Sequence, residues 1–306
     1  MATVRRLPEH VAPMLARIGE PFDAADHLFE IKWDGVRAIT YVESGTLRMH
    51  GRRRRDLASR YPELKNLVAL PDGTVLDGEL VVLQPDGRPD FGAIISRENG
   101  TPARAEAAAK VHPVTYIVFD MLYEDHQPLL DLPLSSRRQR LESLVAAVQN
   151  PRLVMSEAVV GNGRDLFAAA CERGLEGIVA KRIDSRYRPG ERTAAWQKIK
   201  PVQAINCLIL GFEPDGARDF KSLIIATDFD GRLQCVGKVG SGLDRAAKTA
   251  LLPQLQARRA QAPLVDTDLE GAWVEPGLFC RVSFLERTAA GSLRAPVFLG
   301  MVENEA

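Results

Sequence analysis

The sequence predicts an α+β protein of two domains, residues 1–201 and 202–306. The chain has 306 residues, 45% of them hydrophobic, which is enough to build two cores. Strand-like and helical segments alternate before Pro201, whereas short strand-like segments dominate after it. This change in the predicted secondary structure places the domain boundary near residue 201.

The first domain is expected to contain six strands and four helices. The first strand and the second are joined by a Ser44-Gly45 turn, which predicts a hairpin. Alternating polar and apolar residues or β-branched runs predict strands over residues 28–42, 46–50, 74–83, 114–123, 176–182 and 196–201. Helical spacing predicts helices over 56–70 (capped by Asp56), 135–149 and 163–174, and the fourth segment, the Ala-rich stretch 102–110, is expected to be a helix or a mobile linker.

The second domain has the pattern of a small β-barrel. Strand-like segments cover residues 204–212, 222–240 and 277–288, and one helical segment covers 243–259. About five short strands with a single helix favour a barrel of the OB type. The glycine-rich GKVGSG at 237–242 lies between these strands and is expected to be a turn.

Composition excludes several classes of protein. Forty basic and 40 acidic residues balance, so binding to an anionic polymer has to rest on local clusters of positive charge. No apolar run is long enough to span a membrane, and a cytoplasmic protein without a membrane contact is expected. Four well-separated cysteines and five scattered histidines do not have the spacing of a zinc site. The P-loop pattern GxxxxGK[ST] is absent.

The segment EIKWDGVR, residues 30–37, is the sharpest local feature. If it is a continuous strand, Glu30, Lys32 and Asp34 share one face, with the lysine between two carboxylates. Asp34 and Gly35 then form a turn from which Arg37 can reach back to an anion. Taken alone, the segment is better explained as a surface strand with a salt-bridged lysine.

Further motifs follow in a fixed order and overturn that simpler interpretation. They are HGRRRRDLASRYPEL, VLDGELVVL, VTYIVFDMLY, EGIVAKR and WQKIKP. The ordered set resembles the nucleotidyltransferase motifs of ATP-dependent DNA ligases, a superfamily that includes RNA ligases and mRNA-capping enzymes. The resemblance runs from about residue 9 to 300 and is strongest to bacterial end-joining and repair ligases. It implies an adenylation domain, ATP-grasp-like, followed by an OB-fold domain, and the activity of DNA ligase (ATP), EC 6.5.1.1.

The resemblance makes Lys32 the nucleophile that accepts AMP from ATP. A free lysine, with a pKa near ~10.4, is protonated at neutral pH and has to lose its proton before it attacks. Lys198 and Lys200 in WQKIKP offer positive charge that disfavours protonation of Lys32 and neutralises the α-phosphate.

Other roles follow from the same resemblance. Glu79 and Glu176 match carboxylates that hold Mg²⁺ or Mn²⁺, and Glu79 also matches a ribose contact. Phe119 corresponds to the aromatic residue that stacks on adenine, and Glu30 to the residue that reads its amino group. The resemblance assigns phosphate or nucleotide contacts to Lys181, Arg37 and Arg52.

Nicked duplex DNA is the expected partner. Four consecutive arginines, Arg52, Arg53, Arg54 and Arg55, can bind backbone phosphates without reading sequence. Arg53 and Arg54 depart from the family pattern of Asn and Gly. Arg294 matches the last motif, but the following Val302, Asn304 and Glu305 depart from it, which puts self-adenylylation in doubt. We expect a minimal monomer that depends on an end-joining or repair partner protein.

Two other functions fit the same motifs. One is an RNA ligase or a capping-type transferase of the same superfamily. The other is a nucleic-acid-binding protein that keeps the fold and has lost catalysis.

Overall fold

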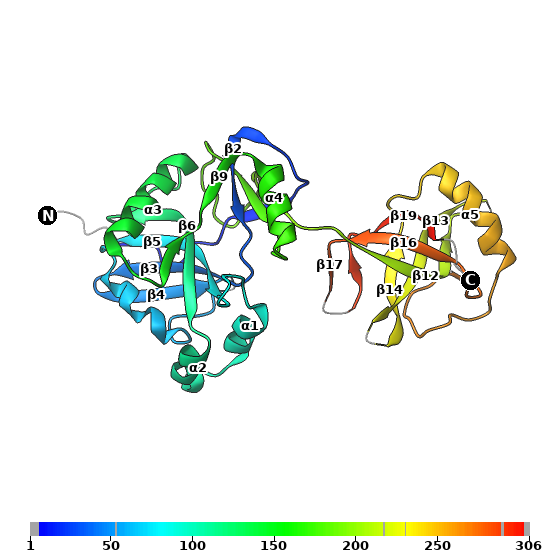
Figure 1. Cartoon of the computed structure of the whole chain (residues 1–306), viewed down its shortest axis with the longest axis horizontal. Coiled ribbons are helices and arrows are strands. Elements are labelled where there is room, and N and C mark those ends of the chain that lie inside the picture. The colour runs from blue at the N-terminus through cyan, green and yellow to red at the C-terminus, as the bar shows by residue number, and fades with distance from the viewer. Residues whose placement is uncertain (1–5, 53, 217, 230, 289–290, 303–306) are drawn as a thin grey trace. The chain divides into compact units, whose positions relative to one another are not determined.

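The computed structural model describes residues 6–52, 54–216, 218–229, 231–288 and 291–302. The chain divides into two compact units, Met1–Lys200 and Pro201–Ala306 (Figure 1). Strands and helices alternate in the first unit and strands predominate in the second, so the predicted α+β class is confirmed. None of the described helices is long and apolar enough to cross a membrane.

Two β-sheets form the frame of the first unit. The larger sheet has the strand order β4-β3-β5-β6-β7, with β8 paired to β6. Its strands are β3 (Val36–Glu43), β4 (Thr46–Gly51), β5 (Thr74–Val82), β6 (Val114–Glu124), β7 (Gln127–Pro128) and β8 (Leu153–Met155). The smaller sheet has the order β1-β11-β10-β2-β9. Its strands are β1 (Leu15–Ile18), β2 (Ala24–Ile31), β9 (Ala158–Gly161), β10 (Ile178–Arg182) and β11 (Arg192–Ile199).

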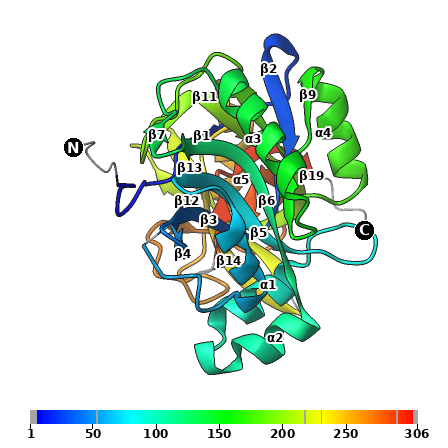
Figure 2. The same ribbon diagram turned by 90° about the vertical axis from the view of Figure 1, so that its left-hand side faces the viewer.

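Helices cover these sheets. They are α1 (Phe91–Asn99), α2 (Ala105–Val111), α3 (Leu134–Val148) and α4 (Gly163–Glu172), with 3₁₀ segments η1 (Pro62–Ala69) and η2 (Pro102–Arg104). Helix α3 packs against β6 and β8 (Figure 2). Its buried residues Leu134, Arg137, Leu141 and Leu144 recur at helical spacing. Arg137 is fully buried because it pairs with Asp120 of β6, Nε to Oδ1 at 2.7 Å.

The expected single strand over residues 28–42 is wrong. The chain forms two strands, β2 and β3, which belong to different sheets, and residues 32–35 connect them. A Cβ atom at Gly35 would lie 2.2 Å from the carbonyl oxygen of Leu80, so glycine permits the close approach that redirects the chain. Lys32 therefore lies past the end of a strand, and the alternation expected for Glu30, Lys32 and Asp34 does not apply.

The expected helix over 56–70 is wrong in its first half. Asp56 holds a turn instead, accepting hydrogen bonds from the Ala58 amide at 3.1 Å and the Ser59 hydroxyl at 2.9 Å. The 3₁₀ segment η1 then starts at Pro62, which lacks an amide donor and suits a helix start. The sequence interpretation also missed α1, β1, β7, β8 and β9. The other helices and strands predicted in this unit are present, with ends shifted by a few residues.

The second unit is an OB-fold barrel, as predicted. Its main sheet has the order β14-β13-β12-β16-β19, with β15 paired to β12. A bridge between Ser241, just after β14, and Val297 of β19 joins the two ends of this order. The elements are β12 (Gln203–Pro214), β13 (Phe220–Phe229), β14 (Arg232–Val239), α5 (Arg245–Ala257), β15 (Ala272–Trp273), β16 (Phe279–Phe284), β17 (Glu286–Arg287), β18 (Leu293–Arg294) and β19 (Val297–Val302).

Candidate active site

Lys32 lies directly after β2, where the chain leaves the smaller sheet. Its amide donates to the Gly177 carbonyl at 2.9 Å, which ties it to the segment preceding β10. Its ammonium donates to the carboxylate of Glu176, and Lys200 binds the other oxygen of the same carboxylate at 2.7 Å. We call Lys32, Glu176 and Lys200 the Lys32 cluster. Their side chains are 16–21% exposed, so solvent and a ligand can reach them.

A cavity of about 220 Å³ opens beside Lys32 and lies wholly within the first unit. Both sheets and the segment around β1 contribute to its wall. The lining residues are Pro13, Met14, Leu15, Ala16, Glu30, Ile31, Lys32, Trp33, Arg37, Arg52, Glu79, Phe119, Val179, Lys181, Arg192, Trp196 and Lys198. The cavity thus joins one lysine at a strand end to aromatic side chains and to several cations.

Glu30 forms a second cluster of charges in the cavity wall. One carboxylate oxygen accepts from Arg138 of α3 and the other accepts from Lys181 of β10 at 2.8 Å. We call Glu30, Arg138 and Lys181 the Glu30 cluster. Their side chains are only 3–11% exposed. Burial lowers the pKa of Lys181 even though Glu30 is in contact with it.

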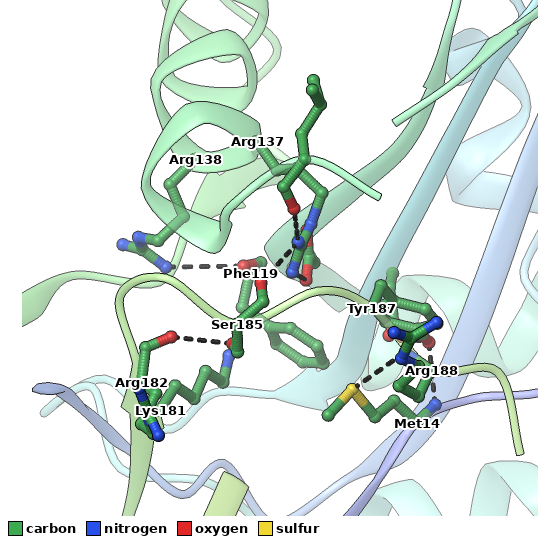
Figure 3. A network of polar contacts seen from close by, with 12 residues as sticks. Met14, Phe119, Arg137, Arg138, Lys181, Arg182, Ser185, Tyr187 and Arg188 are labelled. Carbon is green, nitrogen blue, oxygen red and sulfur yellow. Dashed lines mark hydrogen bonds and ion pairs between the residues drawn. The ribbon is translucent and has the colours of Figure 1, made fainter. Parts of the chain in front are cut away.

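The register of the smaller sheet separates Lys181 from Lys32. Lys181 is opposite Leu28 on β2, four residues before Lys32, which is roughly 13 Å along a strand. Its ammonium lies 4.1 Å from the centre of the Phe119 ring and 4.5 Å from that of Trp196 (Figure 3). Lys181 therefore lies in the aromatic part of the cavity, and its contact with a phosphate stays a prediction.

Arg37 is held by a buried carboxylate instead of reaching back from the turn. Its Nε and Nη2 atoms bind the two oxygens of Asp77 at 2.5 and 2.6 Å. Tyr187 donates to the same Asp77 at 2.7 Å and accepts from the Met14 amide at 2.9 Å. The guanidinium lies 4.5 Å from the centre of the Phe119 ring. Arg37 thus forms a fixed part of the wall beside the aromatic residues.

Three carboxyl groups, those of Glu79, Asp34 and Glu176, lie near Lys32. Glu79 of β5 lines the cavity and, among the described residues, accepts no hydrogen bond and forms no ion pair. Burial raises its pKa to about 7. Burial also raises the pKa of Asp34, and the neighbouring carboxylate of Glu176 adds to the shift. The described residues contain no group of three metal-binding side chains already arranged around a metal position.

The described arginines at 52, 54 and 55 are all exposed, but they differ in their contacts. Arg52 is exposed and lines the cavity, and Arg54 is exposed with a left-handed backbone, φ 59°. Arg55 binds Glu98 of α1 at 2.9 Å, and Arg53 lies outside the described residues. In the second unit, Arg294 is an exposed residue of β18, whereas Asn304 and Glu305 lie outside the described residues.

Sequence reasoning missed several residues that shape the site. Arg138 and Ser156 carried no motif, and Trp33, inside EIKWDGVR, was assigned only to the opposite strand face. The Trp33 indole donates to the Ser156 hydroxyl at 3.2 Å. Met14 and Arg192 also line the cavity. The arginine in the apolar stripe of α3 is Arg137, which binds Asp120, so it gave no signal for the contacts of Arg138.

Two family models cover most of the chain. The "ATP dependent DNA ligase domain" matches residues 11–200, and the "ATP dependent DNA ligase C terminal region" matches residues 216–304. Among curated proteins, the multifunctional non-homologous end joining protein LigD of Pseudomonas aeruginosa is 33% identical over 98% of this chain and 36% of its own length. The SPbeta prophage-derived DNA ligase-like protein LigB of Bacillus subtilis is 32% identical over 94% of this chain and 97% of its own length.

Solved structures give the same result. The ligase domain of Mycobacterium tuberculosis LigD is 33% identical, with a TM-score of 0.58 over 95% of both chains. A mycobacterial DNA ligase D complexed with ATP and MES is also 33% identical, with a TM-score of 0.56 over 96% of both chains. The chain spans 36–38% of the length of the LigD relatives that it matches.

Proposed function

We propose that this chain, which belongs to the ATP-dependent DNA ligase family, seals nicks between a 3′-hydroxyl and a 5′-phosphate in duplex DNA. ATP supplies the energy, and Lys32 carries AMP as a covalent intermediate. The position of Lys32 carries this proposal: its ammonium projects from a strand end into the wall of a cavity that combines aromatic residues with cations. A mycobacterial relative of similar length was solved with ATP, which supports ATP as the nucleotide.

The first step is attack of the Lys32 amine on the α-phosphorus of ATP. A bond forms between Nζ and phosphorus while the bond from phosphorus to pyrophosphate breaks. The amine has to lose a proton first, and the Glu176 carboxylate already accepts a hydrogen bond from it. We assign Glu176 the role of proton acceptor, because it is in contact with the nucleophile. Lys200 and Lys198 stabilise the charge that develops on the phosphate oxygens.

The Glu30 cluster and the aromatic residues are suited to the purine ring. The buried Glu30 carboxylate and Lys181 ammonium present an acceptor and a donor side by side, which is the pairing that the edge of adenine requires. Arg37 and Lys181 both lie over the Phe119 ring.

A divalent cation fits the carboxyl groups beside Lys32. Glu79 is partly buried and lines the cavity, and desolvation by burial raises its pKa to about 7 in spite of the positive charges of Arg37 and Lys32. Oxygen ligands of this kind suit Mg²⁺ or Mn²⁺. We assign Glu79 and Glu176 to the metal. When bound, the ion supplies positive charge to the triphosphate.

The later steps use DNA. AMP passes from Lys32 to the 5′-phosphate of the nick, and the 3′-hydroxyl then displaces AMP and closes the backbone. Arg52, Arg54 and Arg55 are all exposed; we assign Arg52, which lines the cavity, and Arg54 to DNA phosphates, because Arg55 is paired with Glu98. We propose that the protein acts as a monomer in the bacterial cytoplasm, in DNA repair, with an end-joining or repair protein as partner. Arg294 is assigned to the nucleotide-charging step in line with its motif.

The test is incubation of the full chain with α-labelled ATP and Mg²⁺. Wild-type protein should acquire an acid-labile label, and the Lys32→Ala variant should acquire none. Lys32→Arg is the matched control, because it keeps the positive charge and lacks a nucleophilic amine. Labelling by GTP instead, or sealing of nicked RNA only, would identify a capping-type transferase or RNA ligase. No label at all would identify a binding protein that has lost catalysis.

A further inference from the structure

Arg138 connects helix α3 to both sides of Lys32. It follows Arg137 on α3, and its side chain is 11% exposed. On one side it donates to Glu30, two residues before Lys32. On the other, its Nη2 donates to the Ser156 carbonyl at 2.8 Å. Figure 3 shows Arg138 reaching from the helix toward the Phe119 region of the cavity wall.

Ser156 links Arg138 to Trp33 by a second hydrogen bond. Ser156 follows β8 and is 1% exposed. Its hydroxyl accepts from the Trp33 indole at 3.2 Å, and Trp33 directly follows Lys32 and lines the cavity. The Arg138 guanidinium therefore contacts Glu30, before Lys32, directly. It is linked to Trp33, after Lys32, through Ser156. Its fork of donors allows both contacts at once.

The neighbouring Arg137 shows what a purely architectural arginine looks like in the same helix. It is fully buried, binds both oxygens of Asp120 at 2.7 and 2.8 Å, and caps the carbonyl of Ser185 at 2.9 Å. No lining residue of the cavity is among these partners. Arg138 differs because it binds Glu30, which lines the cavity, and reaches Trp33, which also lines it.

We propose that Arg138 is a positioning residue for Lys32, holding Glu30 and, through Ser156, Trp33 in the pose that directs the lysine ammonium into the cavity. This inference rests on the proposed function for its catalytic consequence, but not for its structural content. A misplacement of about 1 Å in a nucleophile can cost two orders of magnitude in rate. Arg138 therefore acts on the charging step without touching the nucleotide.

The structural content is tested by the three indole N–H resonances of the full chain, from Trp33, Trp196 and Trp273. Trp33→Phe assigns one resonance, and Ser156→Ala shows how it moves when its acceptor is lost. Arg138→Gln and Arg138→Lys should shift the Trp33 resonance and leave that of Trp273, in the second unit, unchanged. Lysine keeps the charge but cannot hold Glu30 and Ser156 together. Arg140→Ala is the matched control. Arg140 lies on the exposed face of α3 and pairs with Glu124 at the end of β6, away from Glu30 and Ser156.

The kinetic consequence is read from labelling by ATP, normalised to the number of active sites. Arg138→Lys and Arg138→Gln should slow labelling about tenfold or more at saturating ATP, whereas Arg140→Ala stays near the wild-type rate. A Trp33 resonance that does not move in either Arg138 variant, or labelling at the wild-type rate, would overturn the inference. If wild-type protein itself takes no label, the proposed function fails, and the Trp33 resonance still decides the placement by Arg138.

Discussion

The Lys32 cluster and the Glu30 cluster have the same pattern of charges and different surroundings. Each has one carboxylate shared by two cations: Glu176 with Lys32 and Lys200, and Glu30 with Lys181 and Arg138. The side chains of the first cluster are 16–21% exposed, and those of the second are 3–11% exposed. Burial is therefore what separates them.

This difference sets what each cluster can do. Buried ions that have lost their water depend on one another, so the Glu30 cluster is expected to stay fixed and to present a constant pattern of donors and acceptors. Partly hydrated ions exchange partners at low cost. Lys32 and Lys200 can therefore leave Glu176 for phosphate oxygens. The molecule thus combines a rigid end suited to a base with an adaptable end suited to phosphate chemistry.

The largest effect on stability is expected from the buried cluster. Glu30→Gln leaves two buried cations without their carboxylate and should lower the free energy of unfolding by about 3 kcal/mol. Glu176→Gln is the matched variant of the exposed cluster and should cost about 1 kcal/mol or less. Urea unfolding of both variants measures the difference. Equal losses would show that the two clusters do not differ in burial as described.

The raised pKa of Glu79 predicts that stability depends on pH. Burial raises its folded pKa from 4.5 to about 7, so the folded state favours the neutral carboxyl and the unfolded state ionises first. The contribution of Glu79 to stability is therefore full below about pH 4.5 and is lost as pH rises toward 7. Without a divalent cation, the Tm of wild type should fall relative to that of Glu79→Gln between pH 5 and 8.

Mg²⁺ provides the control for the Glu79 experiment. If the ion binds the ionised carboxylate, it should raise the Tm of wild type more at pH 8 than at pH 6 and affect Glu79→Gln less at both. A Tm difference that does not change with pH would contradict the raised pKa. An equal response of both proteins to Mg²⁺ would remove Glu79 from the metal assignment.

The smallest effects are expected in the arginine run. Arg52 is exposed beside the cavity, whereas Arg55 is bound to Glu98. Arg52→Ala should weaken binding to nicked duplex and lower the slope of log affinity against log salt by about 1, the effect of one lost phosphate contact. Arg55→Ala should leave this slope unchanged and cost under about 1 kcal/mol of stability. Equal slopes in the two variants would show that Arg52 and Arg55 contribute equally to DNA binding, as parts of one surface.

Much of the fold could be predicted from sequence because hydrophobic periodicity is local. The strand at β6 and the helices α3, α4 and α5 were visible in this way. The end of the strand after Ile31 could not be predicted in this way, because it depends on the close approach of Gly35 to the carbonyl of Leu80, which is distant in sequence. Short strands such as β1 and β9 were not predicted for a related reason, since the strands that they pair with lie far along the chain.

The site was predictable only as a set of motif positions. Lys32, Glu30, Glu79, Phe119 and Lys198 line one cavity, but sequence could not show which cations share a carboxylate. Pairing of Lys181 with Glu30 depends on strand register, and capture of Arg37 by Asp77 depends on the sheet that β3 and β5 form. Arg138 was overlooked because its role arises only when α3 packs against β6 and β8.

The most direct test of the central claim is to locate the nucleotide on the protein. Wild-type chain is charged with ATP and Mg²⁺, digested, and its peptides are sequenced by mass spectrometry. The account predicts adenylate on the amine of Lys32 and on no other residue. Adenylate on a different lysine, or uncharged protein under conditions in which ATP and Mg²⁺ are saturating, would contradict it.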